Sequence, residues 1–376
     1  MKNERLLLSI PTLLGTEAIV ANEVRKLGYD TTEVIDGRVT FEGDFEAICL
    51  ANINLRCAER VMIKVAEFRA TTFDMLFKGV ASVEWERYIE RDAAFPVKGF
   101  SLKSQLHSVP DCQKIIKKAI ASRLSSKYGI QWFDETGAMY PIQFGLMKDT
   151  VTLYIDTSGV SLYKRGYRQK GVVAPMRETL AYAVLDVARW RGDRVFFDPF
   201  CGSGTLPIEA ALYASNIAPG INRHFVSETW VNHIGAGAWK DARDEARENE
   251  NKNCDVHIYA SDISADAIKT ARANAARAHV ADKIHFNVCD VKDLKPFNGN
   301  GIIVCNPPYG ERLMDAESCE KLYAVMRKKF NEFAHTKKYI FTSHEKFESI
   351  YGKCDKRRKL YNGMLKCYIY QYFKDI

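Results

Sequence analysis

Four apolar segments in the second half of the chain each end in a polar residue that could contact a ligand. These residues are Asp198, Asp262, Asp290 and Asn306. The segments before them are short and rich in β-branched and aromatic residues, which predicts strands buried on both faces of a parallel sheet. Ligands of open α/β sheets bind outside the carboxyl ends of the strands. We therefore expect the four polar side chains to gather around a small-molecule site.

The first of these strands runs into a glycine-rich turn. The sequence Asp198-Pro199-Phe200-Cys201-Gly202-Ser203-Gly204-Thr205 precedes Leu206–Ala214, whose apolar spacing predicts a helix. Glycines permit positive φ, so a ligand can approach bare backbone beside the N-terminus of that helix. A tight turn without a ligand would use the same glycines. Cys201 has no neighbouring base in the sequence, and we interpret it as a small packing residue.

Two departures from the nicotinamide-binding pattern argue against a dehydrogenase. The turn lacks the third glycine of G-x-G-x-x-G. Asp262 also follows the turn at far more than the roughly 20 positions expected before the acid that binds the ribose. The extra length is a polar, charged insertion, Ser215–Asp255.

The composition is that of a globular protein in a reducing compartment. The 376 residues are 47% hydrophobic and 27% charged, which allows two or three domains. No apolar run is long enough to span a bilayer, and the first residues lack the apolar core of a signal peptide. The ten cysteines form no CxxC pair and show no metal-ligand spacing. We therefore expect a cytoplasmic protein with reduced thiols and no metal.

The net charge of +7 is concentrated in two basic segments. Such clusters favour a polyanionic partner, although solvated helix faces are an equal alternative for either one alone. Candidate RNA-binding residues in the first segment are Lys98, Lys103, Lys114, Lys117, Lys118 and Arg123. The second segment contains Lys353, Lys356, Arg357, Arg358, Lys359 and Lys366.

The first half of the chain predicts alternating strands and helices without catalytic residues. Asp36-Gly37 is typical of a hairpin turn, and Asp44 of a helix N-cap. Ser101–Ser104 is expected to be a strand, and Asp111 is expected to cap a long helix, Cys112–Lys127. From residue 194 onward the pattern is that of an alternating β/α domain.

The motifs DPFCGSGT, APMRETL and NPPYGER together resemble those of class I S-adenosylmethionine-dependent methyltransferases that modify exocyclic amines. The surroundings of Lys98–Arg123 resemble a THUMP domain, an RNA-binding module. The whole chain is similar to bacterial THUMP-domain methyltransferases that modify the guanine N2 of 23S ribosomal RNA. The resemblance implies a doubly wound, Rossmann-like α/β domain with a mostly parallel seven-stranded sheet whose last strand is antiparallel. It follows an α+β RNA-binding region.

The resemblance also implies a division of the chain and a set of cofactor contacts. We expect a ferredoxin-like subdomain at 1–55, a THUMP domain at 56–160, a linker at 161–174 and the methyltransferase domain at 175–376. Asp262 would accept both ribose hydroxyls of the cofactor, and Asp290 with Val291 would bind its adenine. Helix capping is the alternative role of these two acids. The full candidate set is Arg177, Glu178, Asp198, Pro199, Cys201, Gly202, Gly204, Thr205, Asp262, Ile263, Asp290, Val291 and Asn306.

Asn306-Pro307-Pro308-Tyr309 is the expected catalytic loop. An exocyclic purine amine is a poor nucleophile because its lone pair is delocalised into the ring. The Asn306 side-chain oxygen and the Pro307 carbonyl could each accept one amine hydrogen, which draws the nitrogen towards sp³ geometry and aims its lone pair at the methyl group. Tyr309 could stack on an extruded base. Positioning would then supply the rate without a strong general base.

Two other functions use the same features. NPPY also serves adenine-N6 methyltransferases that act on DNA or RNA. A non-catalytic RNA-binding factor in ribosome assembly could keep the fold without turnover. The expected partner in the favoured interpretation is large-subunit ribosomal RNA.

Overall fold

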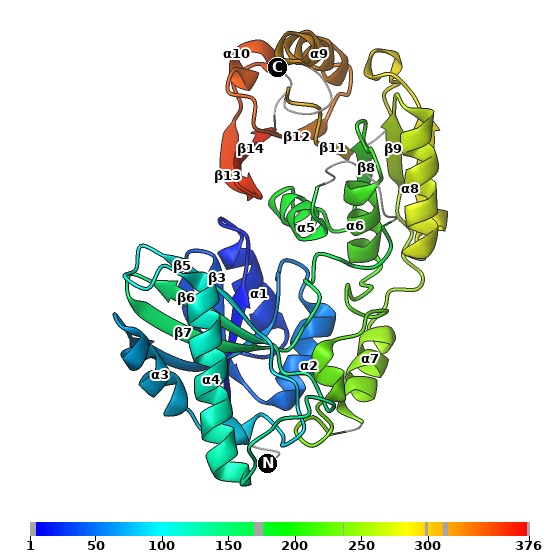
Figure 1. Ribbon diagram of the computed structural model, residues 1–376. Helices are drawn as coiled ribbons and strands as arrows, with labels where there is room; N and C mark the ends of the chain where they lie inside the picture. The colour runs from blue at the N-terminus through cyan, green and yellow to red at the C-terminus, as the bar shows by residue number, and fades with distance from the viewer. Residues whose placement is uncertain (1–4, 169–175, 236, 298–299, 311–314, 374–376) are drawn as a thin grey trace.

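The computed structural model describes residues 5–168, 176–235, 237–297, 300–310 and 315–373, and it contains two seven-stranded sheets (Figure 1). Residues 169–175, which include part of the expected linker, lie outside the described residues, as do Glu311 and Arg312. No helix in the described ranges is both long and apolar enough to cross a membrane.

The first sheet is formed entirely by the N-terminal half of the chain. Its strand order is β2 (Thr31–Ile35), β3 (Arg38–Gly43), β1 (Leu6–Pro11), β4 (Met62–Arg69), β7 (Thr150–Asp156), β6 (Ile142–Met147) and β5 (Val97–Leu102). Its helices are α1 (Glu17–Lys26), α2 (Phe45–Asn54), α3 (Phe73–Ala81) and α4 (Val109–Tyr128). Because β1 pairs with β4, the segments before and after α2 share one sheet.

Two local expectations in this half are wrong. The strand expected at Ser101–Ser104 is β5, which begins earlier and ends at Leu102. The long helix α4 begins at Val109, so Asp111 lies in its first turn and Ser108 occupies the N-cap. Pro110 causes this shift because a proline is tolerated in the first helical turn, where no N–H donor is needed. The Ser108 hydroxyl donates a hydrogen bond to Asp111 Oδ2 at 2.6 Å.

The second sheet confirms the expected doubly wound α/β fold. Its strand order is β10 (Ile284–Val288), β9 (Ile258–Asp262), β8 (Val195–Asp198), β11 (Gly301–Cys305), β12 (Thr336–Thr342), β14 (Leu365–Tyr372) and β13 (Lys356–Asn362). β14 runs antiparallel to both of its neighbours. The helices of this half are α5 (Glu178–Val187), α6 (Thr205–Ala214), α8 (Ala265–Arg277), α9 (Ala316–Phe330) and α10 (Phe347–Tyr351).

The insertion after α6 packs on the N-terminal half, a placement that the sequence did not predict. Its helix α7 (Ala238–Glu248) lies beside α2 (Figure 1). The Trp230 ring stacks on Tyr140 with a centroid separation of 4.5 Å, and its indole N–H donates to the Met139 carbonyl at 2.8 Å. The buried apolar residues of the insertion therefore belong to the core of the first sheet.

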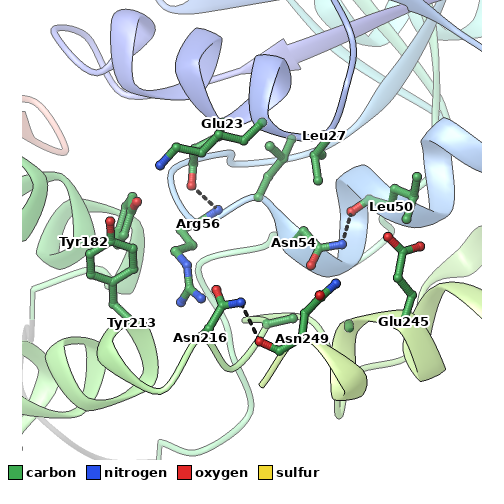
Figure 2. Close-up of a pocket in the computed structure, with 14 residues that line it drawn as sticks. Glu23, Leu27, Leu50, Asn54, Arg56, Tyr182, Tyr213, Asn216, Glu245 and Asn249 are labelled. Carbon is green, nitrogen blue, oxygen red and sulfur yellow. Dashed lines mark hydrogen bonds between the residues drawn. The ribbon is translucent and has the colours of Figure 1, made fainter. Parts of the chain in front are cut away.

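A polar cavity of about 330 Å³ lies where α1, α2, the insertion, α5 and α6 meet (Figure 2). The Arg56 guanidinium lies over the rings of Tyr182 and Tyr213, at 5.7 and 5.3 Å from their centroids. The Glu23 carboxylate accepts the backbone N–H groups of Arg56 and Cys57 at 2.9 and 3.0 Å. Burial raises the pKa of Glu23 to about 7. Arg56 thus links the N-terminal half to two helices of the C-terminal half.

Replacing Trp230 with alanine should detach the insertion from the first sheet. The side chain is 1% exposed, so its removal leaves a large cavity and should lower the free energy of unfolding by roughly 3–5 kcal/mol. Trp132→Ala is the matched control, because that tryptophan is 79% exposed. Denaturant titration of both variants measures the difference, and equal stability of the two would contradict the packing described above.

Candidate functional site

The carboxyl edge of the second sheet brings together the four polar residues that end the apolar segments. Asp198 and Asp262 are the last residues of the neighbouring strands β8 and β9. Asp290 follows β10 and caps a short 3-10 helix, and Asn306 follows β11 directly. Adjacent parallel pairing of these strands places all four side chains along one edge, as expected of a ligand site in this architecture.

The glycine-rich turn is held in place by Asp262. Gly202 and Gly204 adopt positive φ angles of 52° and 86°. The Gly202 N–H donates to Asp262 Oδ2 at 3.0 Å, while Asp262 Oδ1 accepts the N–H of Ser264 at 2.9 Å. A Cβ atom on Gly204 would lie 3.0 Å from the Cβ of Ala271, so this glycine allows α6 to pack closely on α8.

Asp198 at the end of β8 and Cys201 in the turn after it are both buried. Asp198 is 1% exposed and accepts the Phe200 N–H at 3.0 Å, and burial raises its pKa well above the usual range. Burial likewise raises the pKa of the Cys201 thiol, so this residue stays protonated at neutral pH. The Thr205 hydroxyl accepts a hydrogen bond from Arg168 at 3.0 Å. The turn therefore offers its backbone groups to a ligand. The buried, protonated Cys201 fits the packing role expected from the sequence.

The outer part of the edge combines acids with an exposed apolar side chain. Asp290 Oδ1 accepts the Lys292 N–H at 3.1 Å, and this hydrogen bond lowers the pKa of Asp290. Val291 is buried, whereas Ile263, the residue after Asp262, is 70% exposed. An exposed isoleucine beside two carboxylates offers an apolar surface to a flat ring. This arrangement fits the adenosine of S-adenosylmethionine.

Arg177 and Glu178 have protein partners. Arg177 Nη1 lies 3.0 Å from Glu59 Oε2, and its guanidinium lies over the Tyr163 ring at 4.8 Å. Glu178 is ion-paired with Arg168 at 3.2 Å, and burial raises its pKa to about 7. These contacts connect α5 to the N-terminal half and to the segment before it. A cofactor contact by either residue stays a prediction.

The expected catalytic loop contains an unused hydrogen-bond acceptor. Asn306 Oδ1 is buried and has no hydrogen-bond partner among the described residues. The loop around it is held by the Tyr323 hydroxyl, which donates to the Pro308 carbonyl at 2.6 Å. Asn362 Nδ2 donates to the Tyr309 hydroxyl at 3.4 Å. A buried acceptor without a partner costs roughly 1–3 kcal/mol. A substrate contact by this oxygen stays a prediction.

The candidate RNA-binding cations of the first half divide into two groups. Arg123 Nε donates to Glu86 Oε2 at 2.9 Å, and Lys117 lies 2.7 Å from Glu135. Lys114 lies 3.9 Å from Asp111. By contrast, the side chains of Lys98, Lys103 and Lys118 are exposed without an ion-pair partner in the described ranges. The exposed group is the better candidate for phosphate contacts.

The second sheet defines a class I S-adenosylmethionine-dependent methyltransferase by its strand order, its antiparallel strand β14 and the glycine turn after β8. Residues 165–371 match the family model described as the RMKL-like methyltransferase domain. Residues 8–62 match the RlmL ferredoxin-like domain, and residues 70–156 match the THUMP domain. The chain belongs to the RMKL-like methyltransferase family.

Two relatives extend this assignment. The protein named "Putative RNA methyltransferase YpsC" from Bacillus subtilis (strain 168) is 46% identical across 100% of this chain and 97% of its own length. A ribosomal RNA large subunit methyltransferase K/L from Psychromonas ingrahamii is 33% identical over 96% of this chain. The match covers 49% of that relative, so the chain spans about half its length.

Two solved structures share the whole fold. A crystal structure described as that of a predicted N6-adenine-specific DNA methylase from Listeria monocytogenes is 47% identical, with a TM-score of 0.93 over 98% of this chain and 96% of that one. The crystal structure described as that of "SMU.472, a putative methyltransferase complexed with SAH" is 38% identical, with a TM-score of 0.95 over 100% of this chain and 99% of that one. S-adenosylmethionine is thus the cofactor of this fold.

Replacing Asp262 with alanine should weaken S-adenosylmethionine binding. A hydrogen bond to a charged acceptor contributes roughly 1.5–3 kcal/mol, so the dissociation constant should rise about 10- to 150-fold. Asp262→Asn removes the negative charge but keeps one oxygen that can accept the Gly202 N–H. This variant therefore distinguishes loss of the charge from loss of the hydrogen bond that supports the turn. Asp282→Ala, with a side chain 76% exposed, is the control. If calorimetry shows that Asp262→Ala binds S-adenosylmethionine with the wild-type affinity, the role of Asp262 is purely structural.

Proposed function

We propose that the protein transfers a methyl group to the exocyclic N2 amine of a guanine in large-subunit (23S) ribosomal RNA. The observation that supports this most is the unpartnered, buried Oδ1 of Asn306 at the carboxyl edge of the sheet, which finds no donor among the described residues. That atom accepts hydrogen bonds and cannot donate them, so it favours a substrate that presents a hydrogen-bond donor, as an exocyclic amine does. The names of the large-subunit relatives support ribosomal RNA as the substrate.

The reaction requires positioning more than acid–base catalysis. S-adenosylmethionine supplies an electrophilic methyl group on a sulfonium. Asn306 Oδ1 and the Pro307 carbonyl each accept one hydrogen of the amine, and the nitrogen lone pair is thereby directed away from the base plane. Pro307 and Pro308 fix the backbone of the loop, since their rings restrict φ. Transfer would break the bond between the methyl group and sulfur, so S-adenosylhomocysteine would leave as a neutral thioether. The nitrogen is then cationic and releases its proton to water.

An adenine-N6 methyltransferase is the second candidate, and the similarity to the Listeria monocytogenes protein, described as a predicted N6-adenine-specific DNA methylase, favours it. An adenine N6 amine would meet the same two acceptors. Incubation with labelled S-adenosylmethionine and transcribed large-subunit ribosomal RNA, followed by nucleoside analysis, separates the two products. Label in N6-methyladenosine alone would replace the guanine proposal. A protein that binds RNA but fails to bind S-adenosylmethionine in a titration would instead be a non-catalytic factor.

Asn306→Ala should remove most methyl transfer and leave cofactor binding nearly intact. Loss of one preorganised hydrogen bond to the transition state should lower kcat about 100- to 1,000-fold. Asn22→Ala on the exposed face of α1 is the matched control. Single-turnover transfer and calorimetric cofactor binding are measured together. Near-normal turnover of the Asn306 variant would reject the proposed mechanism.

Replacing Lys98, Lys103 and Lys118 together with glutamine should weaken RNA binding through lost phosphate contacts. Each lost contact reduces the slope of log affinity against log salt by roughly 0.7–0.9. Arg123→Gln should instead lower stability, because Arg123 is held by Glu86. Filter binding over a salt series tests this, and an unchanged slope in the triple variant would place the RNA-binding surface elsewhere.

A further inference from the structure

The β13–β14 hairpin extends past the rest of the second sheet at the edge that carries the catalytic loop. Pairing of β12 with β14 ends at Thr342 and Tyr368. Pairing of β13 with β14 continues to Asn362 and Leu365. At about 3.3 Å per residue, the last three residues of this pairing extend the hairpin by roughly 10 Å. The Asn362 side chain at its end donates to the Tyr309 hydroxyl, so the tip adjoins the catalytic loop.

One face of this hairpin alternates cations with tyrosines. The directly paired residues on that face are Arg357 with Tyr370, Lys359 with Tyr368, and Tyr361 with Lys366. The Lys359 Nζ lies 5.8 Å from the Tyr361 ring centroid, and the Lys366 Nζ lies 5.7 Å from that of Tyr368. Both lysines are exposed and both tyrosines are half-buried.

The structural role of the hairpin belongs to its opposite face. Leu360, Cys367 and Ile369 are fully buried in the core of the second sheet. On the same side, Arg358 donates to the Gly15 carbonyl at 2.7 Å and connects the hairpin to the N-terminal half. The end of the cation and tyrosine face that lies farthest from the turn is covered as well. There the Tyr370 ring packs on Phe347 of α10, with a centroid separation of 4.8 Å. Lys359, Tyr361, Lys366 and Tyr368 form the open part, which we call the hairpin face.

The turn of the hairpin presents an apolar side chain to solvent. Met364 is 99% exposed, and it forms the two-residue turn with Gly363, whose φ of +66° suits a tight hairpin. A methionine this exposed, at a turn beside the expected catalytic loop, buries no apolar area on folding. Methionine is, however, among the apolar side chains that proteins insert between base steps.

We propose that the hairpin face and Met364 bind the single-stranded RNA that flanks the target nucleotide. Lys359 and Lys366 contact phosphates, Tyr361 and Tyr368 stack on neighbouring bases, and Met364 occupies the position in the stack that the extruded base vacates. The inference rests on the proposed function, because it places the extruded base against Tyr309. Alternating lysines and tyrosines suit single-stranded RNA, because the cations can bind its phosphates while the rings stack on its bases.

Three variants of the full-length protein test the components. Lys359→Gln with Lys366→Gln should reduce the salt slope for a short oligoadenylate by about 1.4, since each single-strand phosphate contact contributes about 0.7. Tyr361→Leu keeps apolar bulk but removes a stacking ring, and its affinity for that RNA should fall about tenfold. Met364→Ser should lower methylation of transcribed large-subunit ribosomal RNA severalfold, with little change in oligoadenylate binding.

The controls separate this inference from the proposed function. Lys328→Gln with Lys337→Gln removes the same charge from exposed positions on α9 and at the opposite edge of the sheet, and should leave the salt slope unchanged. All variants should bind S-adenosylmethionine as the wild type does. If the wild type methylates the transcript but the hairpin variants match it, the inference is wrong and the proposed function stands. If the wild type methylates no RNA, the proposed function fails first.

Discussion

The geometry of the candidate site depends on the two hydrogen bonds that the Asp262 carboxylate accepts. One comes from Gly202 in the turn after β8 and the other from Ser264 at the start of α8. They fix the glycine turn against the end of β9 while leaving Asp262 itself half-buried at the edge. The same carboxylate can therefore organise the loop and face a ligand. Capping and cofactor binding, which are alternatives for an isolated acid, are compatible here.

The position of the RNA-binding region relative to this site is set by contacts between the two halves of the chain. The insertion Ser215–Asp255 belongs to the catalytic half by sequence but packs in the core of the first sheet. Arg56 reaches the opposite way, over Tyr182 of α5 and Tyr213 of α6 (Figure 2). Because each half contributes to the other's packing, the THUMP domain and the strand edge are held in a defined arrangement.

Much of this fold follows from local sequence patterns, and the exceptions have a common cause. The strands β8 and β11 are buried apolar segments, and the turn glycines mark the end of β8, so both were predictable. The expectation that all four strands are buried on both faces is wrong for β10, which lies at the edge of the sheet and buries only Ile284 and Phe286. The destination of the insertion was not predictable, because Trp230 packs on Tyr140, which is remote in the sequence. Arg177 was assigned to the cofactor from resemblance, yet its partner Glu59 comes from the N-terminal half. Long-range pairing of this kind leaves no periodic signal.

Asn306 shows why the proposed catalytic loop has to be rigid before a substrate arrives. An unpaired buried oxygen is unfavourable, and a flexible loop would rotate it towards any available donor. The two prolines restrict the backbone, and the Tyr323 hydroxyl holds the Pro308 carbonyl. Tyr323 is itself fully buried against Phe347 and His344, so it cannot follow a moving loop. The energetic cost of the unpaired acceptor is thus carried by the surrounding core, and in the proposed mechanism it is relieved when an amine binds.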